Sequence, residues 1–505
     1  MDTTRPRIIA VAGGKGGVGK SLLAANVGIY LATIGKRVVL VDAALGSANL
    51  HTFVGEVRPQ RTIAELLGND DVDLEAIAEP TPIPGVRLIA GERDPSWIAH
   101  PRVGQIKRLA ELLPQLEADV VVIDLPSGTN ALLLELFLIA DIKVSVVVPE
   151  PTSVELCYRL IRAAFIRELK RSGLSEAAKI SAAEQQEFES GIPSALDIYF
   201  RAMDRDPVVA QSLRETMQSF RPNLIVNCAR SKSDMELGKS MAGAARRRMG
   251  LPIGSLGHVE YDEAVWVALR RKRPLIVEHP ESRVAKCIEK LSRKMIGYNE
   301  TPSPLVFDES HYELFDVAPT ASFEDIRRAN RRIREVYSSH SVVTTGLYTQ
   351  QRLEDLHRQI EGAYRTLMDS TRRKEYDLEL FPDGLPSRMI LGDPAVTAAL
   401  EAPPPEDRPD MPVITPDTDF TGALLQRIRE AKGIQLRDIA ERSKIGMAYL
   451  TSIEEERFNK LPAVVYVRGF LVQYATILAV DPDRVLDTYL ERYRKARRAL
   501  DAEDQ

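Results

Sequence analysis

A phosphate-binding loop is the first feature of the chain with residues suited to chemistry. The pattern G-x-x-x-x-G-K-[ST] is present at Gly14, Gly19, Lys20 and Ser21. Glycines let backbone N–H groups turn toward phosphate oxygens, the lysine reaches the β- and γ-phosphates, and the serine hydroxyl holds Mg²⁺. Such a loop requires a strand before it and a helix after it. The apolar run 8–12 and the helical run 22–31 meet this requirement, so the sequence predicts a nucleotide-binding site.

An α/β sheet domain is predicted to position this loop. Between residues 7 and 297, short β-branched runs alternate with helical stretches, which indicates a mostly parallel sheet with helices on both faces. The predicted strands span residues 8–12, 37–41, 86–90, 120–124, 143–148, 223–226 and 255–259. Ligands bind at the carboxyl ends of the strands in open α/β sheets. Asp42, Asp124 and Asn227 stand at such ends.

A second lysine early in the loop indicates a particular class of phosphate-binding loop. Lys15 gives the form K-G-G-x-G-K-[ST], which resembles the deviant Walker A loop of the ParA/MinD superfamily. The resemblance implies ATP and Mg²⁺ as ligands and an ATP-dependent homodimer, with Lys20 on the subunit's own nucleotide and Lys15 on that of the partner. The nucleotide-binding residues that it implies are Gly14, Lys15, Gly16, Gly17, Val18, Gly19, Lys20 and Ser21.

The segment after the second predicted strand departs from the family. Residues 41–50 resemble the first switch segment of the MinD and FlhG branch, D-x-D-x-G-x-x-N-L-D, and Asp42 matches the first acid, near Mg²⁺. The second acid, which positions the attacking water in the family, is Ala44 here, and the later Asp is His51. Losing a general base or water-positioning group typically costs about 10²–10⁴ in rate. The sequence therefore predicts ATP binding with weakened hydrolysis.

Two further strand ends complete the expected site. Residues 120–128 resemble the family's Walker B strand, which implies that Asp124 binds Mg²⁺ together with Ser21 and Asp42. Asn227 is an adenine contact by resemblance, but an Asn that caps a turn explains it equally well. At Glu260 the family usually has proline, so a base contact there is left open.

The length of 505 residues predicts several domains. The ATPase domain is expected at 1–300, with a helical insertion at about 160–220, and two small all-α domains follow it. Residues 303–380 resemble a J domain, but residues 336–341 contain no His-Pro-Asp triplet, so only the helical fold is inferred. A proline-rich acidic linker is predicted at 381–418.

The last predicted domain, residues 419–495, resembles the cytoplasmic domain of RodZ, with helix-turn-helix elements at 436–443 and 447–454. In that family the domain docks on an actin-like filament, so a protein partner, with a cytoskeletal one as a candidate, is implied. Positive and negative charges are nearly balanced here, and residues 446–456 contain no Lys or Arg. Because DNA affinity depends on phosphate neutralisation, protein docking is favoured. The basic stretch 492–498 leaves DNA binding open.

The amino-acid composition argues against several classes of protein. A net charge of −5 gives no general bias toward nucleic acid, and three scattered cysteines argue against an iron–sulfur or structural zinc site and indicate a cytoplasmic location. No run of 18 apolar residues predicts a membrane span, and residues 283–296 are expected to be a core-packing helix. The expected function is an ATP-binding dimerisation switch that organises or positions a bacterial cell component. A non-hydrolysing scaffold and a DNA-binding regulator are the alternatives.

Overall fold

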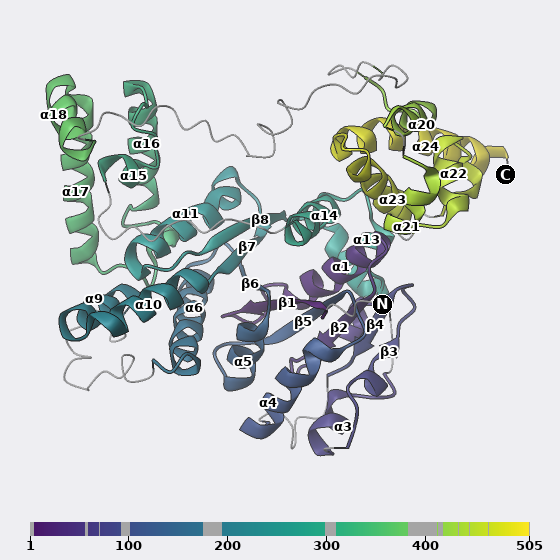
Figure 1. The fold of residues 1–505 in the computed structure, drawn as a ribbon, viewed down its shortest axis with the longest axis horizontal. Helices are drawn as coiled ribbons and strands as arrows, with labels where there is room; N and C mark the ends of the chain where they lie inside the picture. Colours follow the sequence, from purple (N-terminus) through teal and green to yellow (C-terminus); the bar gives the residue numbers. More distant parts are fainter. Residues whose placement is uncertain are drawn as a thin grey trace.

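The computed structural model describes residues 5–55, 59–69, 71–91, 101–174, 194–297, 310–381, 412, 418–432, 434–443, 445–462 and 464–503 (Figure 1). The predicted linker lies almost entirely outside these residues, as does part of the predicted helical insertion, residues 175–193. Among the described residues, no helix is both long and apolar enough to cross a membrane.

An eight-stranded sheet forms the centre of the N-terminal half, in the order β3-β4-β2-β5-β1-β6-β7-β8. The strands are β1 Arg7–Gly13, β2 Val38–Asp42, β3 Glu79–Pro80, β4 Val86–Ile89, β5 Val120–Ser127, β6 Ile142–Val147, β7 Pro222–Ala229 and β8 Gly254–Glu260. All neighbouring pairs are parallel except β3 and β4. The prediction of a mostly parallel sheet is confirmed.

Helices cover both faces of the sheet, because successive side chains of a buried strand point to opposite faces. In β1, Ile8 and Ala10 belong to one core, and Ile9 and Val11 belong to the other. The first core is covered by α3 Ile63–Gly68, α4 Val103–Leu112, α5 Ala131–Ile139, α6 Pro151–Arg171, α9 Ala195–Arg205, α10 Pro207–Ser219 and α11 Lys232–Met249. The second is covered by α1 Lys20–Thr33, α2 Leu50–Phe53, α12 Ala264–Arg271, α13 Leu275–Glu278 and α14 Arg283–Ile296. Two short 3₁₀ turns are Glu75–Ile77 and Leu113–Gln115.

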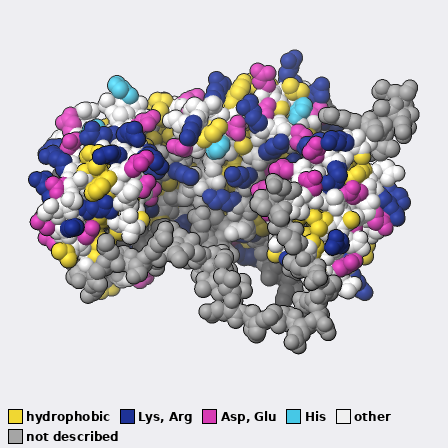
Figure 2. All heavy atoms as spheres, turned by 90° about the horizontal axis from the view of Figure 1, so that it is seen from above, with side chains coloured by type: hydrophobic (Ala, Val, Ile, Leu, Met, Phe, Trp, Pro, Cys, Tyr) yellow, Lys and Arg dark blue, Asp and Glu magenta, His cyan; other side chains and the backbone are white. Residues whose placement is uncertain are grey.

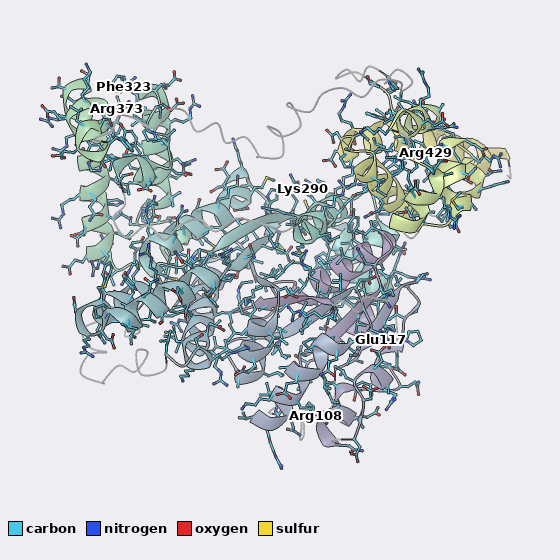
Figure 3. The ribbon with its side chains drawn as sticks, viewed as in Figure 1. Arg108, Glu117, Lys290, Phe323, Arg373 and Arg429 are labelled. Atoms are coloured by element: carbon cyan, nitrogen blue, oxygen red, sulfur yellow. The ribbon has the colours of Figure 1, made fainter. Side chains whose placement is uncertain are left out.

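The helices of residues 310–381 pack directly on α6 and α11. They are α15 His311–Phe315, α16 Phe323–Val336, the 3₁₀ turn η3 Val342–Thr344, α17 Gln350–Met368 and α18 Ser370–Leu380. The buried Tyr158 hydroxyl of α6 donates to the Val343 carbonyl at 3.0 Å, and Arg247 of α11 donates to the Tyr337 hydroxyl at 2.7 Å. Their apolar side chains belong to the same cluster as the first core of the sheet domain. Within these helices, Arg373 lies over the Phe323 ring, 5.6 Å from its centroid (Figure 3).

The last helices form a separate cluster around their own core. They are α20 Gly422–Ala431, α21 Leu436–Ser443, α22 Met447–Glu454, the 3₁₀ turn Phe458–Lys460, α23 Val464–Ile477 and α24 Pro482–Glu503. The two predicted helices of the helix-turn-helix motif coincide with α21 and α22. Inside this core, Arg429 pairs with Glu454 at 2.6 Å (Figure 3).

Candidate nucleotide-binding site

The phosphate-binding loop joins β1 to α1 and depends on glycine at several positions. Gly17 and Gly19 have φ of 76° and 92°, in the left-handed region that side chains rarely adopt. A Cβ atom on Gly19 would also lie 2.2 Å from Asn227 Nδ2, and one on Gly14 would lie 2.2 Å from the Leu156 carbonyl oxygen of α6. The loop is therefore compact because its glycines allow the backbone to approach α6 and β7 closely.

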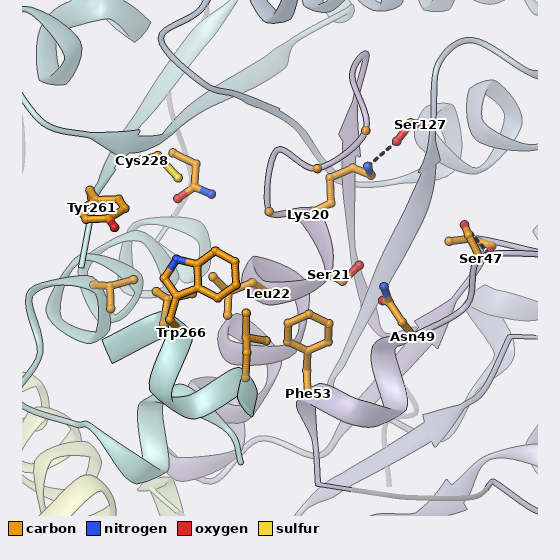
Figure 4. Close-up of a pocket in the computed structure, with 18 of the residues that line it drawn as sticks. Lys20, Ser21, Leu22, Ser47, Asn49, Phe53, Ser127, Cys228, Tyr261 and Trp266 are labelled. Carbon is orange, nitrogen blue, oxygen red and sulfur yellow. Dashed lines mark hydrogen bonds between the residues drawn. The ribbon is translucent and has the colours of Figure 1, made fainter. Parts of the chain in front are cut away.

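Lys20 lies at the bottom of this loop with its ammonium group turned toward β5. The residue is buried, and Nζ donates to Ser127 Oγ at 2.7 Å (Figure 4). Burial lowers the pKa of Lys20, and the nearby Asp124 carboxylate opposes this shift. The ammonium thus lies near Ser127 and Asp124, both on β5, where a phosphate oxygen would complete its coordination.

Two fully buried carboxylates lie side by side beneath the loop, because β2 and β5 are neighbours and Asp42 is in register with Asp124. Asp42 accepts hydrogen bonds from the backbone N–H groups of Ala44 at 3.1 Å and Leu50 at 2.9 Å, and burial raises its pKa. Neither carboxylate oxygen of Asp124 has a hydrogen-bond partner among the described residues.

This arrangement fits a divalent cation. Burial raises the pKa of Asp124 to about 7, the Asp42 charge adds to the shift, and Ser21 and Lys20 oppose it. A buried carboxylate without a partner is costly, and a cation would remove that cost. No cluster of three metal-ligating side chains occurs within the described ranges. Mg²⁺ needs no such cluster, since it binds through one or two carboxylates, water and phosphate oxygens. Ser21, Asp42 and Asp124 would hold it.

Replacing Asp124 with Asn is expected to raise the Tm of the ligand-free protein at pH 8 by at least about 2 °C. The raised pKa means that the folded protein holds this proton more tightly than the unfolded chain does. Stability contributed by the protonated form is therefore lost as the pH rises from about 4 to about 7, and the benefit of Asn is largest above pH 7. Thermal unfolding at pH 5 and pH 8 measures this difference.

The matched control is Asp119→Asn, at the opposite end of β5. Asp119 accepts hydrogen bonds from Arg37, which lowers its pKa despite the contribution of burial, so its loss should be neutral or destabilising. If Asp124→Asn were less stable than the wild type at pH 8, the Asp124 carboxylate could not be uncompensated in the wild-type protein. The variant should also lose any further rise in Tm on adding Mg²⁺ with nucleotide.

A cavity of about 530 Å³ opens beside the loop. One side is polar, with Gly16, Gly17, Gly19, Lys20, Ser21, Ser127 and Asn227. The other side is an apolar wall, which the sequence did not predict, and its members include Leu22, Phe53, Val265, Trp266 and Leu269 (Figure 4). Trp266 is 63% exposed although it lines the cavity. The only sequence signal for this wall is the exposed apolar face of α12, which resembles any amphipathic helix.

Ala44 contributes only a methyl group to the cavity wall. The nearby Ser47 hydroxyl donates to the Ala44 carbonyl at 3.2 Å, so it is engaged with the backbone. His51 is buried and does not line the cavity. Among the described residues of this switch segment, no carboxylate therefore lines the cavity.

Of the other predicted site residues, Gly14, Lys15 and Val18 lie outside the cavity lining, whereas Asn227 belongs to it. Gly14 packs against α6, Val18 is buried, and Lys15 forms an ion pair with Glu150 of the same chain. Asn227 lines the cavity, and its Nδ2 atom donates to the Val18 carbonyl at 2.8 Å. The side chain thus braces the loop, as a turn-capping Asn does, and the adenine contact remains a prediction. Glu260 also lines the cavity.

The fold and the loop define a P-loop nucleotide-binding protein. The family model for the CobQ/CobB/MinD/ParA nucleotide binding domain matches residues 9–276, more than half of the chain, so the chain belongs to this family. A helix-turn-helix domain model matches residues 424–485. The resemblance of residues 303–380 to a J domain remains a prediction.

Several curated proteins and solved structures are similar to the chain. The antiactivator FleN of Pseudomonas aeruginosa is 24% identical over 61% of this chain and 91% of its own length. The septum site-determining protein MinD of Synechocystis is 34% identical over 31% of this chain and 58% of its own length. MinD from Pyrococcus horikoshii, complexed with Mg-ADP, is 22% identical with a TM-score of 0.39, and the match covers 57% of this chain and 96% of that chain.

Proposed function

We propose that the chain is an ATP-dependent dimerisation switch that organises or positions a bacterial cell component, and that its hydrolysis of ATP is weakened. The observation that supports the proposal is a phosphate-loop lysine beside two buried carboxylates, with Ala44 at the position of the water-positioning acid. Lys20 and the buried pair Asp42 and Asp124 are arranged around the phosphate loop, whereas Ala44, which lines the cavity, has no carboxylate. Family membership and the names of the relatives, an antiactivator and septum site-determining proteins, support a positioning role.

The experiment that tests the proposal measures nucleotide binding, self-association and phosphate release on the same preparation. The proposal expects Mg·ATP to bind, to cause dimerisation and to be hydrolysed slowly. A protein that dimerises with ATP and releases no phosphate would instead be the nucleotide-locked scaffold, which Ala44 also favours. A protein that binds no nucleotide would contradict both.

Replacing Lys15 with Ala is expected to leave nucleotide binding intact and to abolish ATP-dependent dimerisation. In the single chain Lys15 pairs with Glu150 at the edge of the loop and does not line the cavity, so it is poorly placed to hold its own subunit's nucleotide. Light scattering with Mg·ATP measures the dimer, and calorimetry measures the binding. Lys232→Ala, at the exposed start of α11, is the control. A Lys15→Ala protein that dimerises normally would rule out this role.

The helix-turn-helix domain is proposed to bind protein rather than DNA. The second helix of the motif, α22, exposes Met447 and Tyr449, which are 45% and 39% exposed, and Tyr449 packs against the Phe470 ring at 5.4 Å. Met and Tyr side chains are enriched at protein–protein interfaces relative to the rest of the surface. Charges of both signs are interspersed over this end of the molecule (Figure 2). Duplex binding that weakens steeply with salt would favour the DNA-binding regulator instead.

A further inference from the structure

The helix-turn-helix domain contacts the nucleotide-binding domain through a glycine on α23. A Cβ atom on Gly469 would lie 2.8 Å from the Thr33 carbonyl oxygen and 3.1 Å from Ile34 Cγ2, both at the C-terminal end of α1. In Figure 1, α23 lies beside α13 and α14, which cover the same face of the sheet as α1. Glycine is therefore needed for the close approach of the two helices, and not for the conformation of α23 itself.

An ion pair lies next to this glycine. Arg468 Nε donates to Glu289 Oε2 at 3.1 Å, and a second, shorter bond joins the same side chains. Glu289 stands on α14, and its side chain is 6% exposed, whereas that of Arg468 is 11% exposed. The other Glu289 oxygen accepts from Arg293 at 2.5 Å. Two arginines, one from each domain, thus compensate a single nearly buried carboxylate.

Further ion pairs surround this centre. Arg293 Nη1 donates to Asp483 of α24 at 2.9 Å, and Glu281 pairs with Arg494 of α24 and lies 3.6 Å from Arg468.

The apolar cluster of the helix-turn-helix domain contains no residue of the sheet domain among those described. Residues 310–381, in contrast, share one apolar cluster with the sheet domain. The helix-turn-helix contact is therefore mainly ionic, as interfaces between transiently associated domains often are.

The two helices that the helix-turn-helix domain contacts, α1 and α14, both reach the nucleotide cavity. At its N-terminus α14 is tied to the cavity wall, since the Arg283 N–H donates to Asp262 Oδ2 at 3.0 Å and Val284 lines the cavity. Glu289 is five residues further along the same helix. The other contacted helix, α1, begins at Lys20 in the phosphate loop and ends at Thr33, against Gly469. The contact is thus built on the two helices that a bound nucleotide would touch.

We propose that this contact is a releasable ionic latch within the chain, defined by Arg468, Gly469, Glu289 and Glu281. In the closed state the nucleotide-binding domain covers the Arg468–Gly469 face of α23 and withholds it from other proteins. Removal of the ion pair releases the helix-turn-helix domain, which stays attached through residues 381–418. Release leaves no unpaired charge buried in the protein, because water solvates the latch residues when the domains separate.

Small-angle X-ray scattering of the full-length chain tests the latch with two chemically different changes. Gly469→Ala adds a methyl group against the α1 backbone, although alanine stabilises a helix relative to glycine by about 0.8–1.0 kcal/mol. Arg468→Glu places two carboxylates in contact. Both variants are expected to have a larger radius of gyration and maximum dimension than the wild type at low salt.

Two control variants change charge nearby without touching the latch. Arg457→Glu alters an arginine that pairs with Glu455 inside the helix-turn-helix domain, and Lys290→Glu alters an exposed lysine on α14 (Figure 3). Both are expected to stay compact, and circular dichroism should show an unchanged helix content for every variant. Compact Gly469→Ala and Arg468→Glu proteins would overturn the proposal.

Discussion

Replacing Ala44 with Asp is expected to raise the rate of ATP hydrolysis at saturating ATP by about 10²-fold or more, within the range of about 10²–10⁴ that a positioned base contributes. The backbone around the residue is already set, because the Ala44 N–H donates to Asp42, and Ala44 lines the cavity. A carboxylate there would hold the attacking water in line with the γ-phosphate. Positioning and charge stabilisation supply most of the acceleration in phosphoryl transfer.

Phosphate release by the wild type and by Ala44→Asp measures this effect directly. Ser47→Asp is the matched control, since it adds the same charge to the same segment and to the same cavity wall. Its turnover should stay at the wild-type level. If the wild type already hydrolyses ATP rapidly, or if both Asp variants accelerate it equally, the methyl group of Ala44 is not what limits hydrolysis.

Replacing Lys20 with Ala is expected to weaken the binding of Mg·ADP by tenfold to more than a hundredfold. A hydrogen bond to a charged group contributes about 1.5–3 kcal/mol, and each 1.4 kcal/mol is a factor of ten in affinity. Lys20, whose Nζ is held 2.7 Å from Ser127 Oγ, is the one lysine or arginine among the described residues that line the cavity (Figure 4).

Titration calorimetry with Mg·ADP measures the loss without any dependence on turnover. Lys239→Ala, on the exposed side of α11, removes the same charge from the chain and should bind like the wild type. The ligand-free Lys20→Ala protein should unfold at a similar temperature, because burial already disfavours the charged form of this lysine. An unchanged affinity would mean that the loop does not hold phosphate.

The sequence predicted the parts of the fold that local pattern encodes. Seven of the eight strands were expected, because most are buried apolar runs between helical stretches, although β8 buries only Leu256 and Val259. The edge strand β3 was missed, since its two residues, Glu79 and Pro80, have neither alternation nor apolar character. The helices α21 and α22 were located at their observed ends, where the apolar spacing and the intervening turn are both clear in the sequence.

The contacts between distant segments could not be predicted in this way. The Tyr158 to Val343 hydrogen bond joins residues 185 positions apart, and the Arg468 to Glu289 pair joins residues 179 positions apart. No periodicity connects such positions. The family resemblance implied that Asp42 and Asp124 share a Mg²⁺ ion. Their adjacency comes from the strand order β2-β5-β1, which no local pattern encodes.

The apolar cluster shared by α6, α11 and residues 310–381 has a practical consequence for dividing the gene into expressible pieces. A fragment that stops near residue 300, where the relatives' similarity would suggest a cut, leaves the Tyr158 ring and the face of α11 around Arg247 exposed to water. Burial of each large side chain of this kind is worth about 1.5–3 kcal/mol. The smallest autonomous nucleotide-binding unit of this chain therefore extends to about residue 381, and the helices after residue 310 belong to its scaffold.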